Sequence, residues 1–127
     1  MMAVDTSALM AIVLNEQQAD ACVAALEAED VLLISAGTVA EALVVAARRN
    51  VGEEMERLID GLGFEVAAVT RAAARRVARA YERWGRGMHP AGLDFGDCFA
   101  YEVAKQRGCR LLFVGADFKQ TDIAGVL

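Results

Sequence analysis

The chain has 127 residues, 56% of them hydrophobic, with a formal net charge of −5 and a mean hydropathy of +0.31. This length suits one domain over residues 1–127, and the acidic balance argues against a nucleic-acid partner unless basic residues gather in one place. No apolar run approaches the roughly 20 residues of a membrane span, and Asp5 interrupts the N-terminal segment where a secretory signal would lie. Three cysteines without a close pair argue against disulfides and a zinc knuckle, and they fit a reducing, cytoplasmic setting.

Short strands and helices alternate along the chain. The predicted strands are Met2–Val4, Val31–Ile34, Phe64–Ala67 and Leu111–Val114. The predicted helices are Ser7–Leu14, Gln17–Glu29, Gly37–Asn50, Glu53–Leu62, Thr70–Arg86 and Phe95–Arg107. The segment GRGMHPAG is the one clear loop, and the tail FKQTDIAGVL predicts a further helical turn and a short strand. This alternation predicts a mainly parallel sheet of four to five strands with helices on both faces.

Carboxylates recur where these strands end. Asp5 follows the first strand, Glu41 lies in the helix after the second, and Asp117 follows the fourth. Asp94 and Asp97 open the helix that leads into the fourth strand. Ligands of such folds bind beyond the carboxyl ends of the strands, where strand order reverses, so we expect these acids to converge at one edge of the sheet.

A cluster of this kind needs cations, because buried carboxylates are costly and raise one another's pKa. The chain has one histidine and no paired cysteines. Its oxygen-rich set therefore predicts Mg²⁺ or Mn²⁺, two of which could clamp a phosphodiester. Thr6 and Ser7, beside Asp5, are candidates to orient that carboxylate or to hold a water bound to the metal.

Each acid also has a purely structural interpretation. Thr38 with Glu41, and Asp94 with Asp97, fit helix caps, while Asp117 fits a turn. Asp5 fits a cap for the helix that begins at Ser7.

The predicted helix Thr70–Arg86 is strongly basic, with six of the 13 Lys and Arg residues of the chain. Its apolar stripe is predicted to face the core and consists of Ala73, Val77, Ala80 and Trp84. The remaining faces carry the candidate contacts to phosphates or to an acidic partner segment: Arg75, Arg79, Arg83 and Arg86. A solvated helix face is the alternative interpretation of these arginines.

Four segments in this order, MAVDTSAL, TVAEAL, HPAGLDFGDCFAYEVAKQRG and LLFVGADFKQTDI, resemble a PIN domain, and more narrowly a VapC-type ribonuclease toxin of a bacterial type II toxin–antitoxin pair. The resemblance covers nearly the whole chain. It implies a three-layer α/β/α sandwich and an endoribonuclease that uses Mg²⁺ or Mn²⁺. The family's catalytic and metal-binding acids fall on Asp5, Glu41, Asp97 and Asp117.

The resemblance also implies partners and one departure. Relatives are usually homodimers, held inactive by a cognate VapB-like antitoxin whose C-terminal segment lies across the active-site groove. Asp94 stands where the family often carries asparagine, so it is a candidate to support the site, cap the helix or change metal affinity. Thr121, in the tail TDI, is a further candidate for a supporting role.

We therefore expect cleavage of RNA phosphodiester bonds by metal-activated water, leaving a 5′-phosphate and a 3′-hydroxyl. One alternative is another Mg²⁺-dependent phosphotransfer domain, such as a receiver or a haloacid-dehalogenase-like fold, although Asp5-Thr6-Ser7 meets neither pattern. The other alternative is a non-enzymatic interaction module in which the acids are caps or the remnant of a site.

Overall fold

The computed structural model describes all residues, 1–127. Its strands are β1 (Met2–Val4), β2 (Leu32–Ser35), β3 (Glu65–Ala67) and β4 (Arg110–Leu112). Its helices are α1 (Thr6–Val13), α2 (Ala19–Glu27), α3 (Ala36–Arg48), α4 (Gly52–Leu62), α5 (Arg71–Trp84), α6 (Phe95–Arg107) and the 3₁₀ turn η1 (Asp117–Gln120). The predicted order of strands and helices is confirmed, with boundaries that move by a few residues.

All neighbouring strands of the sheet are parallel, in the order β3-β2-β1-β4. The chain moves from β1 to β2 on one side and later returns to β4 on the other. Strand order therefore reverses between β1 and β4, and a ligand site is expected at their carboxyl ends.

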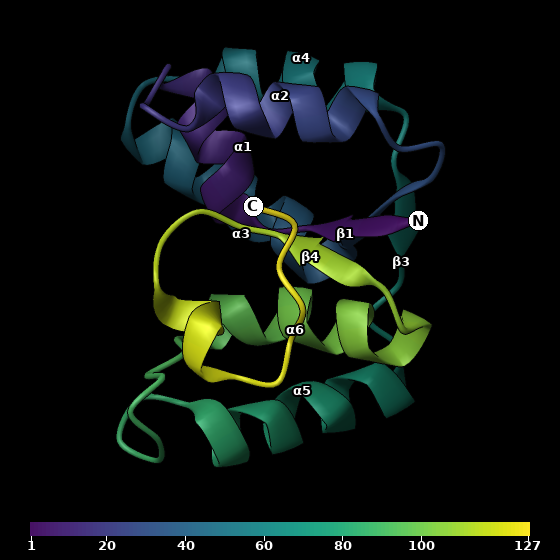
Figure 1. The fold of residues 1–127 in the computed structure, drawn as a ribbon, viewed down its shortest axis with the longest axis vertical. Coiled ribbons are helices and arrows are strands. Elements are labelled where there is room, and N and C mark those ends of the chain that lie inside the picture. The colour runs from purple at the N-terminus through teal and green to yellow at the C-terminus, as the bar shows by residue number, and fades with distance from the viewer.

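Alternating side chains divide the core between the two faces of the sheet. Met2 and Val4 face a cluster with α1, α2, α3 and α4, whereas Ala3 faces a cluster with α5 and α6. Leu111 and Leu112 separate in the same way on β4. In Figure 1, α6 lies directly on the sheet and α5 forms an outer layer beyond it. The predicted α/β sandwich is confirmed, with two helices stacked on one face.

Two predicted boundaries need correction. The helix predicted to end at Arg86 ends at Trp84, because Gly85 takes an extended conformation while its amide still donates to the Tyr81 carbonyl. The tail forms η1 but no fifth strand, since it meets the sheet only through a parallel bridge between Leu111 and Gly125. No helix combines the length and apolarity that a membrane crossing requires.

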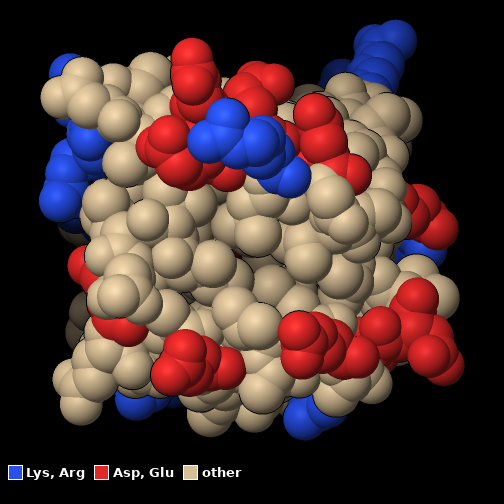
Figure 2. All heavy atoms as spheres, turned by 90° about the horizontal axis from the view of Figure 1, so that it is seen from above, with Lys and Arg blue, Asp and Glu red and all other residues tan.

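The apolar stripe of α5 is buried as predicted, at Ala73, Val77, Ala80 and Trp84. The acids of the chain gather elsewhere. Figure 2 views the side of the molecule formed by α2 and α4, and Asp and Glu dominate the charged atoms there. The net charge of −5 is thus unevenly distributed, with an acidic side at α4 and a basic helix on the opposite side of the sheet.

Candidate active site

The point where strand order reverses is marked by Asp5, the residue directly after β1. Its backbone amide donates to the carbonyl of Leu112 on β4, at 3.0 Å. The Ser7 hydroxyl accepts from the amide of Val114, just beyond β4, also at 3.0 Å. The ends of the two strands are thereby joined around the Asp5 carboxylate.

Asp5 is the N-cap of α1, and only 2% of it is exposed. Its Oδ2 accepts from the Ser7 amide at 3.0 Å and from the Ser7 hydroxyl at 2.6 Å. Its Oδ1 is buried and has no hydrogen-bond partner. Burial raises the pKa of Asp5 to about 6, the Ser7 hydrogen bonds oppose that rise, and the charges of Glu41 and Asp94 add to it. The capping hydrogen bonds use only Oδ2 of the carboxylate, and Oδ1 is left without a partner.

Glu41 reaches the same edge of the sheet from α3. Its Oε1 accepts from the Thr6 hydroxyl at 2.6 Å. Burial raises its pKa, the Thr6 hydrogen bond lowers it, and the charge of Asp94 raises it further. The carboxylate lies so close to the backbone of Gly96 that a Cβ there would collide with it. The sequence suggested Thr6 as a partner of Asp5, but its hydroxyl contacts Glu41.

Asp94 and Asp97 form a reciprocal capping box at the start of α6. Asp94 accepts from the Asp97 amide at 2.8 Å, and Asp97 accepts from the Asp94 amide at 3.0 Å. Burial raises the pKa of Asp97 to about 8, the nearby charge of Asp5 and those of Asp94 and Asp117 raise it further, and the backbone hydrogen bond from Asp94 opposes the rise. The structural interpretation of this pair is correct, yet the pair also faces the other acids.

Asp117 is the first residue of η1 and is exposed. It acts on the site through its charge, which contributes to the raised pKa of Asp97. Thr121 ends the same turn: its hydroxyl donates to the Phe118 carbonyl at 2.7 Å and accepts from the Ile123 amide at 3.2 Å. Thr121 therefore shapes the segment that carries Asp117 and has no hydrogen bond to a site carboxylate.

The capping box suggested for Thr38 and Glu41 is wrong. Ser35 caps α3 by accepting from the Gly37 amide at 3.1 Å, and Thr38 lies inside the helix. Glu41 is therefore free of a capping role.

The donor chemistry of these acids fits a hard divalent cation. Every candidate donor is an oxygen, and one oxygen of Asp5 is buried without a partner. Burial, and to a lesser extent the charges of neighbouring acids, raises the pKa of Asp5 and Asp97. No three His, Cys, Asp or Glu side chains lie close enough together to form a ready-made metal site. The acids would therefore have to draw closer together to share an ion.

The arginines proposed from the sequence do not all have the same surroundings. Arg75, Arg79, Arg83 and Arg86 are all exposed. Arg83 pairs with Asp122 at 3.7 Å, whereas Arg79 forms no ion pair and lines a cavity.

His89 has a structural role in the loop before α6. Its Nδ1 accepts from the Ala91 amide at 3.0 Å, and its ring packs edge-on against Trp84 with centroids 4.7 Å apart. These contacts occupy the only histidine of the chain.

Gly96 is a site residue that was not predicted from the sequence. The FGD segment could have indicated its role. Glycine in the first turn of a helix lowers helix propensity, so a glycine between two site acids indicates that the backbone there lies close to another group.

Comparison with known proteins places this site in a family. The PIN domain model matches residues 2–124. The chain is 41% identical over 128 residues to Ribonuclease VapC30 of Mycobacterium tuberculosis, covering 98% of each chain. It is 41% identical over 126 residues to Ribonuclease VapC42 of the same organism, covering 96% of each. The solved structure of M. tuberculosis VapC20, described as a toxin that cleaves the sarcin-ricin loop, superposes with a TM-score of 0.81 at 16% identity, covering 99% of this chain and 98% of that one.

The chain is a parallel α/β domain whose acids gather where strand order reverses. It belongs to the PIN-domain family, among its VapC-type members. PIN-domain ribonucleases of this type generally depend on a divalent metal ion.

Proposed function

We propose that this protein is a metal-dependent endoribonuclease, the toxin of a toxin–antitoxin pair, acting on RNA in the cytoplasm. The observation that carries the proposal is the Asp5 carboxylate, which is buried where strand order reverses and has one oxygen without a hydrogen-bond partner. Glu41 and Asp94 are close enough to raise the pKa of Asp5, and Asp5 in turn raises the pKa of Asp97. Near-full-length relatives at 41% identity that are named ribonucleases support it.

We assign Asp5, Glu41, Asp97 and Asp117 as the residues that hold Mg²⁺ or Mn²⁺. Bound there, the ion would supply a Lewis acid that neutralises charge on the phosphate and lowers the pKa of water. Ser7 fixes the Asp5 carboxylate in one orientation, and Thr6 does the same for Glu41. Asp94 holds the start of α6, and through it the position of Asp97.

The expected products carry a 5′-phosphate and a 3′-hydroxyl. Cleavage through a 2′,3′-cyclic phosphate commonly uses paired acid and base side chains at the 2′-hydroxyl. The chain has a single histidine, and His89 is engaged with the Ala91 amide and the Trp84 ring. Water is therefore the proposed nucleophile.

A cognate antitoxin and a second copy of the chain are the proposed partners. Solved toxin–antitoxin complexes from Klebsiella pneumoniae and Salmonella typhimurium share the fold, each with a TM-score of 0.70. For this chain the proposed antitoxin is a VapB-like protein that inhibits cleavage by blocking the carboxylate edge.

The test is cleavage of a structured RNA by purified protein with Mg²⁺, with Mn²⁺ and with a chelator, followed by sequencing of the RNA ends. We expect cleavage only with metal, and a loss of at least about 100-fold in Asp5→Asn and in Asp97→Asn. Asp60→Asn, an exposed acid on α4, is the matched control and should cleave like the wild type. Full cleavage by a folded Asp5→Asn variant, or cyclic phosphate ends, would contradict the assignment.

The non-enzymatic interaction module makes a different prediction in the same experiment. Its acids would act only as caps, so calorimetry with Mn²⁺ would detect no binding to the folded protein. Binding that is lost in Asp97→Asn and kept in Asp60→Asn would favour the enzyme.

A further inference from the structure

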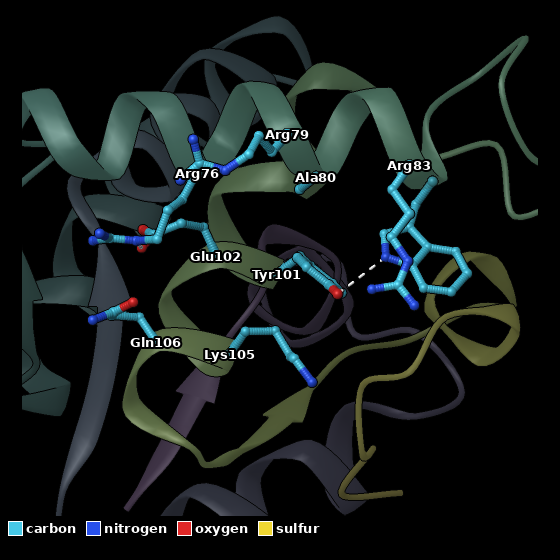
Figure 3. A pocket seen from close by; sticks show the side chains of 9 residues that line it. Arg76, Arg79, Ala80, Arg83, Tyr101, Glu102, Lys105 and Gln106 are labelled. Carbon is cyan, nitrogen blue, oxygen red and sulfur yellow. Dashed lines mark hydrogen bonds and ion pairs between the residues drawn. The ribbon is translucent and has the colours of Figure 1, made fainter.

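A second candidate site is a cavity between α5 and α6, whose lining contains none of the four proposed metal-binding acids. It has a volume of about 300 Å³ and is open to solvent. Figure 3 shows Arg76 and Glu102 on one side of it, Arg83 on the other, and Tyr101 between them. The other lining residues are Arg79, Ala80, Trp84, Lys105 and Gln106.

The charge of this cavity is positive. Its lining contains four cations, Arg76, Arg79, Arg83 and Lys105, and one carboxylate, Glu102. Arg76 is neutralised by Glu102, with 2.9 Å between Nε and Oε2. Arg83 and Lys105 share Asp122 in the tail, at 3.7 and 3.3 Å. Two carboxylates thus face four cations, and Arg79 has no ion pair at all.

Hydrogen bonds link the side chains that line the cavity. The Trp84 indole donates to the Tyr101 hydroxyl at 3.0 Å, and that hydroxyl donates to Asp122 at 2.6 Å. Trp84 and Tyr101 are both buried, and the Arg83 guanidinium lies over the Trp84 ring, 4.5 Å from its centroid. Cations held on a fixed frame lose less side-chain entropy when they bind an anion than cations on a mobile surface do.

The cavity adjoins the proposed catalytic edge through two elements. Asp97, Tyr101 and Lys105 are spaced four residues apart on α6, so they share one face of that helix and span about 12 Å. The tail residue Asp122 follows η1, the turn that carries Asp117 at its start. An RNA strand whose cleaved phosphate lies at the carboxylates can therefore place a phosphate a few nucleotides away over the cavity.

We propose that this cavity binds the phosphate backbone of the RNA strand a few nucleotides from the cleaved bond. The proposal rests on the proposed ribonuclease function and adds a second contact that the carboxylates cannot supply, since they repel phosphate. RNA is favoured over an acidic peptide because the cavity shares α6 with the site where RNA must lie. The acidic side chains of α2 and α4, in contrast, lie on the other face of the sheet (Figures 1 and 2).

The test measures binding separately from cleavage. The probe is a fluorescent single-stranded RNA of about 12 nucleotides, titrated by anisotropy against full-length Asp5→Asn protein in chelator at several salt concentrations. Adding Arg79→Glu should weaken binding roughly tenfold, and Arg79→Ala should reduce the slope of log K against log salt by about 0.7. Arg71→Glu, on the same helix but outside the cavity, is the matched control with a smaller effect.

Equal losses in the Arg71 and Arg79 variants would overturn the proposal, because they would show a nonspecific charge effect. An Arg79→Glu variant that binds RNA normally but loses an Asp/Glu-rich peptide would overturn it in favour of a peptide site. With Mn²⁺ and an intact Asp5, Arg79→Glu should raise KM for a long RNA with kcat within about twofold. A wild type that binds RNA through Arg79 but never cleaves it would refute the proposed ribonuclease while the cavity assignment stands.

Discussion

The backbone of Gly96 on α6 lies against the carboxylate of Glu41 on α3. Any side chain on residue 96 would occupy the space that this carboxylate fills. Glu41 is held on its other side by the Thr6 hydroxyl. The position of one site acid is thus set by a hydroxyl on α1 and by the absence of a side chain on α6.

Gly96→Ala should disable the site without unfolding the protein. The new methyl group meets the end of a flexible glutamate rather than backbone, so Glu41 can rotate away and α6 can keep its place. We expect cleavage to fall by roughly 10- to 100-fold, because a catalytic group is misplaced, with a melting temperature close to that of the wild type. Cleavage assays and thermal unfolding on the same preparation check both parts.

Gly61→Ala is the matched control. Gly61 lies within α4, and a Cβ there would meet nothing within 4 Å. This variant should gain up to about 1 kcal/mol of stability from helix propensity and should cleave normally. A Gly96→Ala variant as active as Gly61→Ala would show that Glu41 is not needed where the structure holds it.

The metal-free protein should lose stability as pH rises above the ordinary pKa of aspartate. The pKa of Asp5 is raised from 3.8 to about 6 and that of Asp97 from 3.8 to about 8. At a pH between the ordinary and the raised pKa of each group, the folded state therefore binds more protons than the unfolded state. Stability then falls with pH, and the favourable contribution, complete below 3.8, is lost through about pH 6 and about pH 8. For the buried Asp5 alone the loss is roughly 3 kcal/mol.

Thermal unfolding in chelator over about pH 5 to about pH 9 measures this loss. Asp97→Asn should flatten the upper part of the profile, since its amide does not titrate. Excess Mn²⁺ should restore stability at high pH by binding only the folded state. A melting temperature that rises between pH 5 and pH 8 in chelator would show that the folded state does not raise the pKa of Asp5 and Asp97.

Asp94→Asn should keep the helix cap and weaken the repulsion. Asparagine caps helices about as well as aspartate, so α6 should start at the same residue. Loss of one negative charge should lower the pKa of Asp5, Glu41 and Asp97, each of which Asp94 raises. The metal-free variant should therefore be more stable than the wild type near pH 8. Asp20→Asn, an exposed acid on α2, is the matched control for the loss of one negative charge. A variant that melts well below the wild type at low pH would mean that the cap needs a charge.

The alternation of strands and helices was readable from the sequence because its signals are local. Asp5 after an apolar strand, the stripe on α5 and the carboxylates near strand ends each depend on a few neighbouring residues. The structure buries the stripe as predicted, and it brings Asp5, Glu41, Asp94 and Asp97 close enough to affect one another's pKa.

Contacts between distant segments could not be read in that way. The pairing of Thr6 with Glu41 spans 35 residues, and that of Ser7 with Val114 spans 107. The end of α5 at Trp84 depends on how Gly85 packs against Tyr81, and the role of Gly96 depends on a side chain from another helix. Each is decided by tertiary packing, which no local pattern encodes.

Ser7→Ala should weaken both the fold and the site. The Ser7 hydroxyl donates to Asp5 and accepts from the Val114 amide, so its loss leaves a half-buried amide without a partner and loosens the link between β1 and β4. We expect a loss of about 1–3 kcal/mol in unfolding free energy. The Asp5 carboxylate also loses a hydrogen bond that lowers its pKa, so Asp5 should ionise at a higher pH than in the wild type.

Cleavage by Ser7→Ala should accordingly fall at neutral pH and recover partly at higher pH, where Asp5 is again ionised. Urea unfolding gives the stability, and a pH–rate profile with saturating Mn²⁺ gives the site effect. Ser7→Thr, which keeps the hydroxyl, should restore most of both. If Ser7→Ala lowers stability and leaves the pH–rate profile unchanged, the hydroxyl serves only to join the two strands, and Asp5 does not depend on it for its charge.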